Sequence, residues 1–210
     1  MKVPLRYQVT RNDCGPTSMT NALSYLLERE EFPPDVLEYV YSVMLDKYRG
    51  ADHPGGTSCW AMRFFGHWLN DTRRTTGLPI EAHQLRGEEV QIGDGMPFVE
   101  CVEQGGVAVM SCLLGKTDHY VLVTGLNRDP EGRIESFRIF DPWYVESEED
   151  LIAEGFPPQY SGLITIDRDH PFAYNRVIGR PVICSNMMIN YSLTCNTPQE
   201  LLLLRRTDGK

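Results

Sequence analysis

The first quarter of the chain carries hydrophobic residues at helical spacing. The first such set consists of Met19, Ala22, Leu23, Leu26 and Leu27. Because these residues recur every three or four positions, they predict an amphipathic helix. Asp13 is a suitable N-cap for this helix, and Pro16 suits its opening turn, where the missing N–H costs nothing. The same spacing predicts a second helix over residues 33–48.

A Gly-rich loop precedes a third predicted helix. Residues 49–58 read R-G-A-D-H-P-G-G-T-S, which is loop chemistry. Thr57 or Ser58 can cap the helix that follows over residues 60–70. Three helices are therefore expected before the first clear strand.

The pattern changes from helical to alternating after residue 77. A strand is predicted at residues 80–85 and a short helix closed by glycines at 96–106. Three apolar runs follow at 107–114, 119–126 and 134–141, separated by turn sequences. Short links between strands predict an antiparallel meander, so we expect an α+β fold in one domain over residues 1–210.

The expected domain has a helical part over about residues 1–77 and a β-rich part over about 78–166. Within the second part, residues 146–156 predict a short helix with acidic residues at its start, and 161–166 a return to the sheet. The pattern is weaker in the tail, residues 167–210, whose role stays open. Its stretch 180–195 favours extended structure, and 198–206 fits a helix or a strand.

Composition and charge exclude several classes of partner. The chain has a formal net charge of −9, with 41% hydrophobic and 23% charged residues. An acidic chain without a basic cluster is repelled by nucleic acid and by anionic membranes, so we expect neither as a partner. No apolar run approaches the about 18 residues of a membrane span, and the given start lacks a signal peptide. We expect a cytoplasmic protein, although a removed leader would leave secretion open.

The cysteines and histidines do not form a metal-binding pattern. The six cysteines, at positions 14, 59, 101, 112, 184 and 195, include no C-x-x-C pair. His53 and His67 flank Cys59 at a spacing too wide for a compact set of ligands. We therefore expect free thiols, no metal and no cofactor.

Cys14 is the strongest candidate for chemistry because it lies at the start of the first predicted helix. The positive end of the helix dipole favours the thiolate, which is the nucleophilic form of cysteine. The alternative is an inert buried thiol. Gln8, six residues earlier, offers an amide N–H that could join the Cys14 backbone N–H around an oxyanion.

A thiolate mechanism also needs a base that can act as an acid, and imidazole suits both roles. His119 begins an apolar strand, which would hold it at a strand end, whereas His170 lies in a polar loop. Asp141 closes the next predicted strand and could hold the imidazole in one tautomer. Alternatively, Asp141 before Pro142 only begins a turn.

Three segments together resemble a known family. The segment Q-V-T-R-N-D-C-G is similar to the Q-x-x-x-x-D-C-G signature of the bacteriocin-processing, double-glycine leader peptidases within the papain-like cysteine peptidases. The segments D-H-Y-V-L-V-T-G and F-D-P-W resemble that family's histidine and aspartate motifs, in the same order. The match spans residues 8–143, and P-T-S after D-C-G resembles the stand-alone relatives rather than the transporter-linked ones.

The resemblance implies a papain-like two-lobe fold, with a helical N-terminal lobe and an antiparallel β-rich C-terminal lobe. It also implies roles for four residues. Gln8 would be the oxyanion donor, Cys14 the nucleophile, His119 the base and acid, and Asp141 the orienting group. The tail has no counterpart in these motifs.

The sequence leaves three functions open. The leading hypothesis is a cysteine peptidase acting on a peptide or protein substrate through a thioester on Cys14. An acyltransferase would pass the acyl group to an amine or thiol instead, and an idle site would leave a peptide-binding module. We also expect residues 53–58 to border the substrate cleft, with an ordinary surface loop as the alternative. Trp143 could shield the His119–Asp141 pair, or be a core aromatic.

Overall fold

The computed structural model describes residues 1–48, 54–115, 117–152, 156–193 and 199–209. The helices are α1 (Cys14–Leu26), α2 (Pro34–Met44), α3 (Cys59–Thr76), α4 (Pro97–Glu103) and α5 (Arg180–Ile183). The strands are β1 (Lys47–Tyr48), β2 (Pro54–Gly56), β3 (Ile80–Arg86), β4 (Val107–Leu114), β5 (Thr117–Arg128), β6 (Ile134–Phe140), β7 (Ile164–Ile166), β8 (Arg176–Gly179) and β9 (Glu200–Arg206). The fold is mixed α+β, as predicted.

One antiparallel sheet of seven strands organises the molecule. Its strand order is β3-β9-β4-β5-β6-β8-β7, and each neighbouring pair is antiparallel. The predicted meander is confirmed, because β4 pairs with β5 and β5 with β6. The strand at 161–166 is also confirmed as β7 at the edge of the sheet. Strands β1 and β2 form a separate two-stranded ribbon beside the helices.

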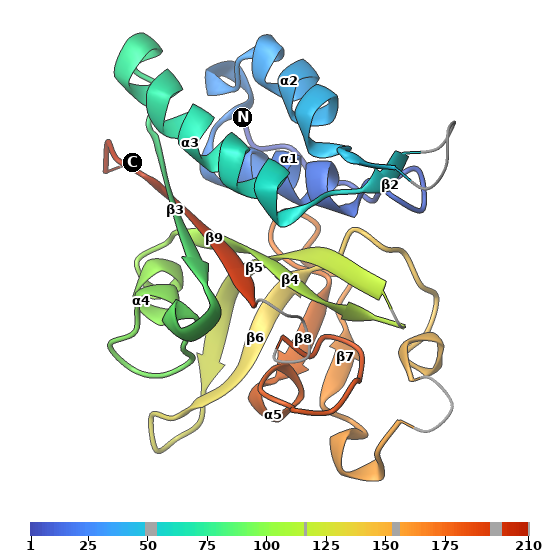
Figure 1. The fold of residues 1–210 in the computed structure, drawn as a ribbon. Coiled ribbons are helices and arrows are strands. Elements are labelled where there is room, and N and C mark those ends of the chain that lie inside the picture. The colour runs from blue at the N-terminus through green and yellow to red at the C-terminus, as the bar shows by residue number, and fades with distance from the viewer. Residues whose placement is uncertain (49–53, 116, 153–155, 194–198, 210) are drawn as a thin grey trace.

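The sheet is buried on both faces. Helices α1, α2 and α3 cover one face, while α4 and α5 lie on the other side (Figure 1). Alternate residues of β4 illustrate the division, because Val109 packs into the core under α1–α3 and Met110 into the opposite core. Helix α1 lies directly on the sheet and is almost entirely buried, which places its first residue against the strands.

Residues 200–206, which the sequence left undecided between helix and strand, form the interior strand β9. This strand lies between β3 and β4. Its leucines divide between the two cores, with Leu202 and Leu204 facing one core and Leu201 and Leu203 the other. A strand buried on both faces reads as a continuous apolar run, so its sequence lacks the alternation that identifies half-exposed strands.

The helix starts agree only in part with the sequence. Asp13 occupies the N-cap position of α1, as predicted, but its side chain makes no capping hydrogen bond to the backbone N–H groups of the helix. Ser58 does cap α3, since its oxygen accepts the N–H groups of Trp60 and Ala61. Helix α2 ends at Met44, short of the predicted 48, because the chain turns there to enter β1.

Two predictions in the second half need correction. Residues 180–183 form the short helix α5, with a proline at its start, rather than extended structure. The helix expected over 146–156 is reduced to one 3-10 turn at Glu149–Leu151, because Ile152 adopts an extended conformation. Residues 153–155 and Cys195 lie outside the described part of the chain.

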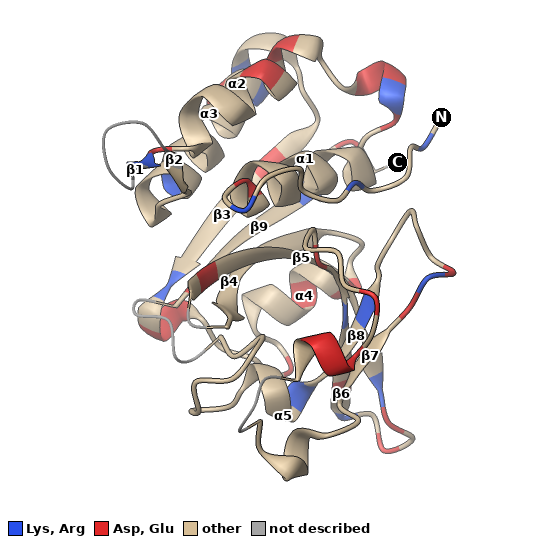
Figure 2. Ribbon diagram, turned by 90° about the vertical axis from the view of Figure 1, so that its right-hand side faces the viewer, with Lys and Arg blue, Asp and Glu red and all other residues tan. Residues whose placement is uncertain are grey.

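Charged residues lie mostly on loops and helix ends. In Figure 2 the basic segments are short and are interspersed with acidic ones. Within the described ranges, no helix combines the length and apolar character needed to cross a membrane.

Candidate active site

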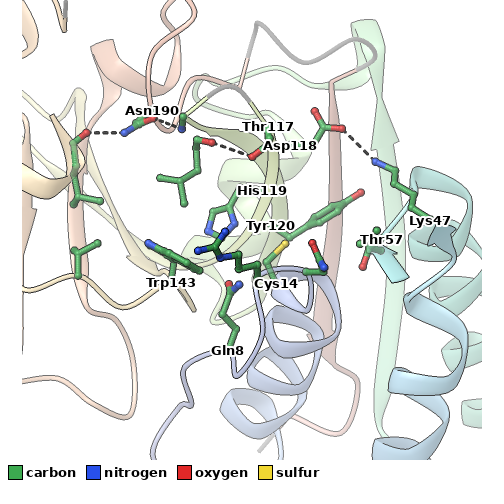
Figure 3. A pocket seen from close by; sticks show the side chains of 18 of the residues that line it. Gln8, Cys14, Lys47, Thr57, Thr117, Asp118, His119, Tyr120, Trp143 and Asn190 are labelled. Atoms are coloured by element: carbon green, nitrogen blue, oxygen red, sulfur yellow. Dashed lines mark hydrogen bonds and ion pairs between the residues drawn. The ribbon is translucent and has the colours of Figure 1, made fainter. Parts of the chain in front are cut away.

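The fold brings together three of the predicted residues from three separate elements. Cys14 is the first residue of α1, His119 lies in β5, and Asp141 directly follows β6. Because β5 and β6 are antiparallel neighbours, with Leu122 opposite Phe140, the end of β6 returns beside His119. Helix α1 packs against these strands, and this places Cys14 next to the His119 imidazole (Figure 3).

His119 and Asp141 form a buried pair. The distance from His119 Nε2 to Asp141 Oδ1 is 2.7 Å, with the two side chains 5% and 0% exposed. When Nε2–H donates to the carboxylate, the other ring nitrogen is left to face Cys14. Desolvation alone would lower the pKa of His119, but the charge and hydrogen bond of Asp141 raise it to about 10. The imidazole is therefore held in its protonated form.

The pKa of Cys14 shifts in the opposite direction. Burial of the thiol would raise the pKa, but the hydrogen bond and charge of His119 outweigh burial and lower it below 9.0. The backbone N–H groups of Tyr120 and Gly15 add to this lowering. A thiolate beside an imidazolium is thus the favoured state, which is the reactive form of a cysteine nucleophile.

Contacts between α1 and β5 fix the distance between Cys14 and His119. The Ser18 hydroxyl, one turn after Cys14, donates to the carbonyl of Tyr120 over 2.9 Å. Gly15 allows α1 to approach the segment between β2 and α3, since a Cβ at position 15 would clash with the Thr57 side chain. The glycine after Cys14 is therefore required by packing, not by a special backbone angle.

The Asp13 side chain shapes the segment between Gln8 and Cys14. Its carboxylate accepts the backbone N–H groups of Val9, at 3.2 Å, and of Thr10, at 2.8 Å. The Thr10 hydroxyl adds a third donor at 2.7 Å. The Asp13 carboxylate is therefore used to fold the preceding turn, and it makes no capping hydrogen bond to α1.

Gln8 lies beside Cys14, as predicted, but one of its donors is already in use. Its backbone N–H donates to Pro142 O over 2.9 Å, which ties the segment before α1 to the residue after Asp141. Its side-chain Nε2 donates to Thr10 O over 2.7 Å. The amide retains a second N–H, and its Oε1 is buried with no hydrogen-bond partner.

The site opens into a cavity of about 800 Å³ between the helices and the sheet (Figure 3). Gly55, Gly56 and Thr57 form part of the wall next to Cys14, so the described part of the 53–58 loop borders the cavity. His53 lies outside the described residues. Across the mouth, Lys47 and Asp118 form an ion pair of 3.2 Å that links the two sides.

Trp143 lines the same cavity and is only half-buried, so the alternative of a core aromatic was wrong. Its backbone N–H donates to Asp141 Oδ1 over 2.7 Å. His170 lies elsewhere, with its side chain half-exposed and paired to Asp167 at 2.8 Å. The structure therefore separates the two histidines that the sequence offered as bases.

The sequence missed the residues that surround Asp141 from the tail. Tyr191 donates its hydroxyl hydrogen to Asp141 Oδ2 over 2.7 Å. Asn175 exchanges two hydrogen bonds of 2.8 Å with the Asp141 backbone. Burial would raise the pKa of Asp141, but His119, Tyr191 and the Arg176 charge lower it, so the carboxylate stays ionised. No local motif marks these residues.

The described cysteines form no disulfide. The five that the structure describes, Cys14 among them, are free thiols. Within the described ranges, no group of three or more His, Cys, Asp and Glu side chains is placed to hold a metal ion. Comparison of the chain with protein-family models gives no match, and no curated protein matches it significantly.

Proposed function

We propose that this chain is a papain-like cysteine peptidase that hydrolyses a peptide amide bond through a thioester on Cys14. The observation that carries the proposal is the arrangement of Cys14, His119 and Asp141. His119 bonds Asp141, the pKa of the Cys14 thiol is lowered and that of the His119 imidazole is raised. The helices on one side of the site and the antiparallel sheet on the other support the two-lobe architecture. The motif resemblance supports the same reading.

In the first half of the reaction, the Cys14 thiolate attacks the carbonyl carbon and the carbonyl oxygen takes up the negative charge. The Cys14 backbone N–H, which has no partner within the helix, and the second N–H of Gln8 stabilise this oxyanion. His119 then gives its proton to the amine as the C–N bond breaks. The amine leaves, and the acyl group remains on sulfur as a thioester.

In the second half, water attacks the thioester carbonyl. His119, now neutral, accepts a proton from the water while Asp141 stabilises the imidazolium that forms. The C–S bond breaks, the acid is released, and the Cys14 thiolate is restored. The proton count balances, because the proton given to the amine is replaced by the one taken from water.

The cavity supports an extended substrate. Its wall combines the glycines of β2 with residues of β5, so the cavity is bordered on both sides by strands. A peptide in extended conformation can lie along such a wall and expose its carbonyl to the sulfur. This geometry favours a peptide or protein over a compact small molecule.

A peptide library in H2¹⁸O tests the proposal. The wild type should release peptides whose new carboxyl termini carry one ¹⁸O atom, and Cys14→Ala should release none. Acyl transfer to an added amine without ¹⁸O-labelled acids would instead identify an acyltransferase. Neither product, from a protein whose Cys14 is reactive, would identify an idle site and overturn the proposal.

A further inference from the structure

We propose that Tyr191 is a positioning residue of this site, which holds the Asp141 carboxylate in the orientation that His119 requires. The meaning of that orientation rests on the proposed function. The residue belongs to the tail, 50 positions after Asp141, where the sequence assigned no role. Through this hydrogen bond the tail takes part in assembling the site.

The contacts of Asp141 divide between its two oxygens. Oδ1 accepts from His119 Nε2 and from the Trp143 backbone N–H, both at 2.7 Å. Oδ2 accepts from the Tyr191 hydroxyl, also at 2.7 Å. A carboxylate turns easily about its last bond, so a donor fixed on Oδ2 acts together with the Trp143 N–H to keep Oδ1 aimed at the imidazole.

The Tyr191 backbone is held in a fixed position by hydrogen bonds to β4. Its φ of 66° is left-handed, a conformation unusual for a residue other than glycine. The Tyr191 N–H donates to Leu113 O over 2.7 Å, and the Leu113 N–H returns a bond to Ser192 O over 3.1 Å. Leu113 belongs to β4, where the adjacent Cys112 is paired with His119 of β5. Strand β4 therefore positions both residues, since it hydrogen-bonds Tyr191 through Leu113 and pairs with His119 through Cys112.

The surroundings keep Tyr191 a donor. Its side chain is fully buried, and burial together with the Asp141 charge raises the phenol pKa well above 10.0. The other groups that face Asp141 are His119 on β5, Arg176 on β8 and the buried Cys112 thiol on β4. Of these, the Arg176 charge also acts on Tyr191, where it lowers the pKa of the phenol. Loss of the phenol hydroxyl therefore removes one of the few groups that stabilise the Asp141 anion.

Titration of Asp141 by NMR tests this role without a substrate. In protein labelled with ¹³C at aspartate carboxyl groups, the Asp141 signal is the one absent from Asp141→Asn. Tyr191→Phe should raise the Asp141 pKa by about one unit, because a hydrogen bond to an ionised group is lost. Tyr160→Phe is the matched control, since the Tyr160 hydroxyl bonds Ser185 of the tail at 3.0 Å and not Asp141. An Asp141 pKa that is the same in both variants would overturn the inference.

A second variant covers the case in which Tyr191→Phe does not fold. Site-specific 3,5-difluorotyrosine at position 191 keeps the ring and gives a more acidic, stronger donor. It should move the resonance of the proton between His119 and Asp141 upfield, because a carboxylate that accepts a stronger hydrogen bond on Oδ2 is a weaker acceptor on Oδ1. An unshifted resonance would contradict the positioning role. An unreactive Cys14 in the wild type would reject the peptidase proposal instead, so the two failures are distinguishable.

Discussion

The Ser18 hydroxyl donates a hydrogen bond of 2.9 Å to the carbonyl oxygen of Tyr120, and both residues are buried. Ser18 lies one turn after Cys14 on α1, and Tyr120 directly follows His119 on β5. The bond therefore joins the helix that carries Cys14 to the strand that carries His119. It sets how far apart the sulfur and the imidazole lie.

Ser18→Ala should uncouple α1 from β5 without unfolding the chain. Loss of the bond is expected to lower the free energy of unfolding by about 1 kcal/mol and to slow Cys14 alkylation at pH 6. Thr20→Val is the matched control, because the Thr20 hydroxyl bonds Pro16 O within the same helix at 2.8 Å. If both variants slow alkylation equally, the Ser18 bond has no special part in the site.

Gln8→Ala should lower kcat by about 100-fold or more and leave the melting temperature nearly unchanged. The reason is that the free N–H of Gln8 acts chiefly when the carbonyl oxygen carries charge. Asn12→Ala serves as the comparison, since Asn12 lines the same cavity from the same segment. Activity of Gln8→Ala within a few-fold of wild type would show that the oxyanion is held by other groups.

Asp141→Ala should release the His119 ring, so that alkylation at pH 6 and turnover fall together. Asp141→Asn should do less harm, because an amide oxygen still accepts the imidazole N–H. Without the carboxylate charge that raises the His119 pKa, the imidazolium should lose its proton at a lower pH than in the wild type.

His170→Ala supplies the control for Asp141, since His170 and Asp167 form a similar pair at 2.8 Å on the surface. It should change neither rate. Loss of activity in His170→Ala with normal activity in Asp141→Ala would mean that the wrong base is assigned.

Gly56→Ala should raise KM and leave Cys14 alkylation by a small reagent unchanged. Gly56 lines the cavity and has a φ of 106°, so an alanine strains the backbone there. Gly77→Ala is the matched control, because Gly77 also has a positive φ, of 79°, but ends α3 away from the cavity. Equal KM values in the two variants would remove the 55–57 wall from substrate binding.

The sequence predicted the parts of the site whose signals are local. Cys14 at a helix start, His119 at the head of an apolar strand and Asp141 at the end of the next can each be read from neighbouring residues. The approach of His119 to Asp141 then follows from the short connection between β5 and β6, whereas the position of Cys14 depends on how α1 packs on the sheet. Asp13 stands at the predicted helix start, but its side chain folds the turn before the helix rather than capping it, and only the geometry decides between these uses.

The role of the tail could not be predicted, because its contacts with the site are not local in the sequence. Tyr191 acts across 50 residues, through a left-handed backbone that no local pattern indicates at a tyrosine. Strand β9 is a run of leucines that lacks strand alternation because both of its faces are buried. In both cases the signal lies in tertiary contacts rather than in neighbouring residues.

We expect Cys14 to rest as a thiolate beside the His119 imidazolium, and the dependence of its alkylation rate on pH measures this state. Chloroacetamide is neutral, so its rate follows the thiolate fraction, and mass spectrometry assigns the modified cysteine. Burial raises the pKa of Cys184, and that of Cys101 to about 11, so both serve as internal controls. Because the Cys14 pKa is lowered, its reaction should begin at a lower pH than that of Cys101 or Cys184, and His119→Ala should remove this difference. A Cys14 rate that rises only near pH 9.0, as for an ordinary thiol, would contradict the account.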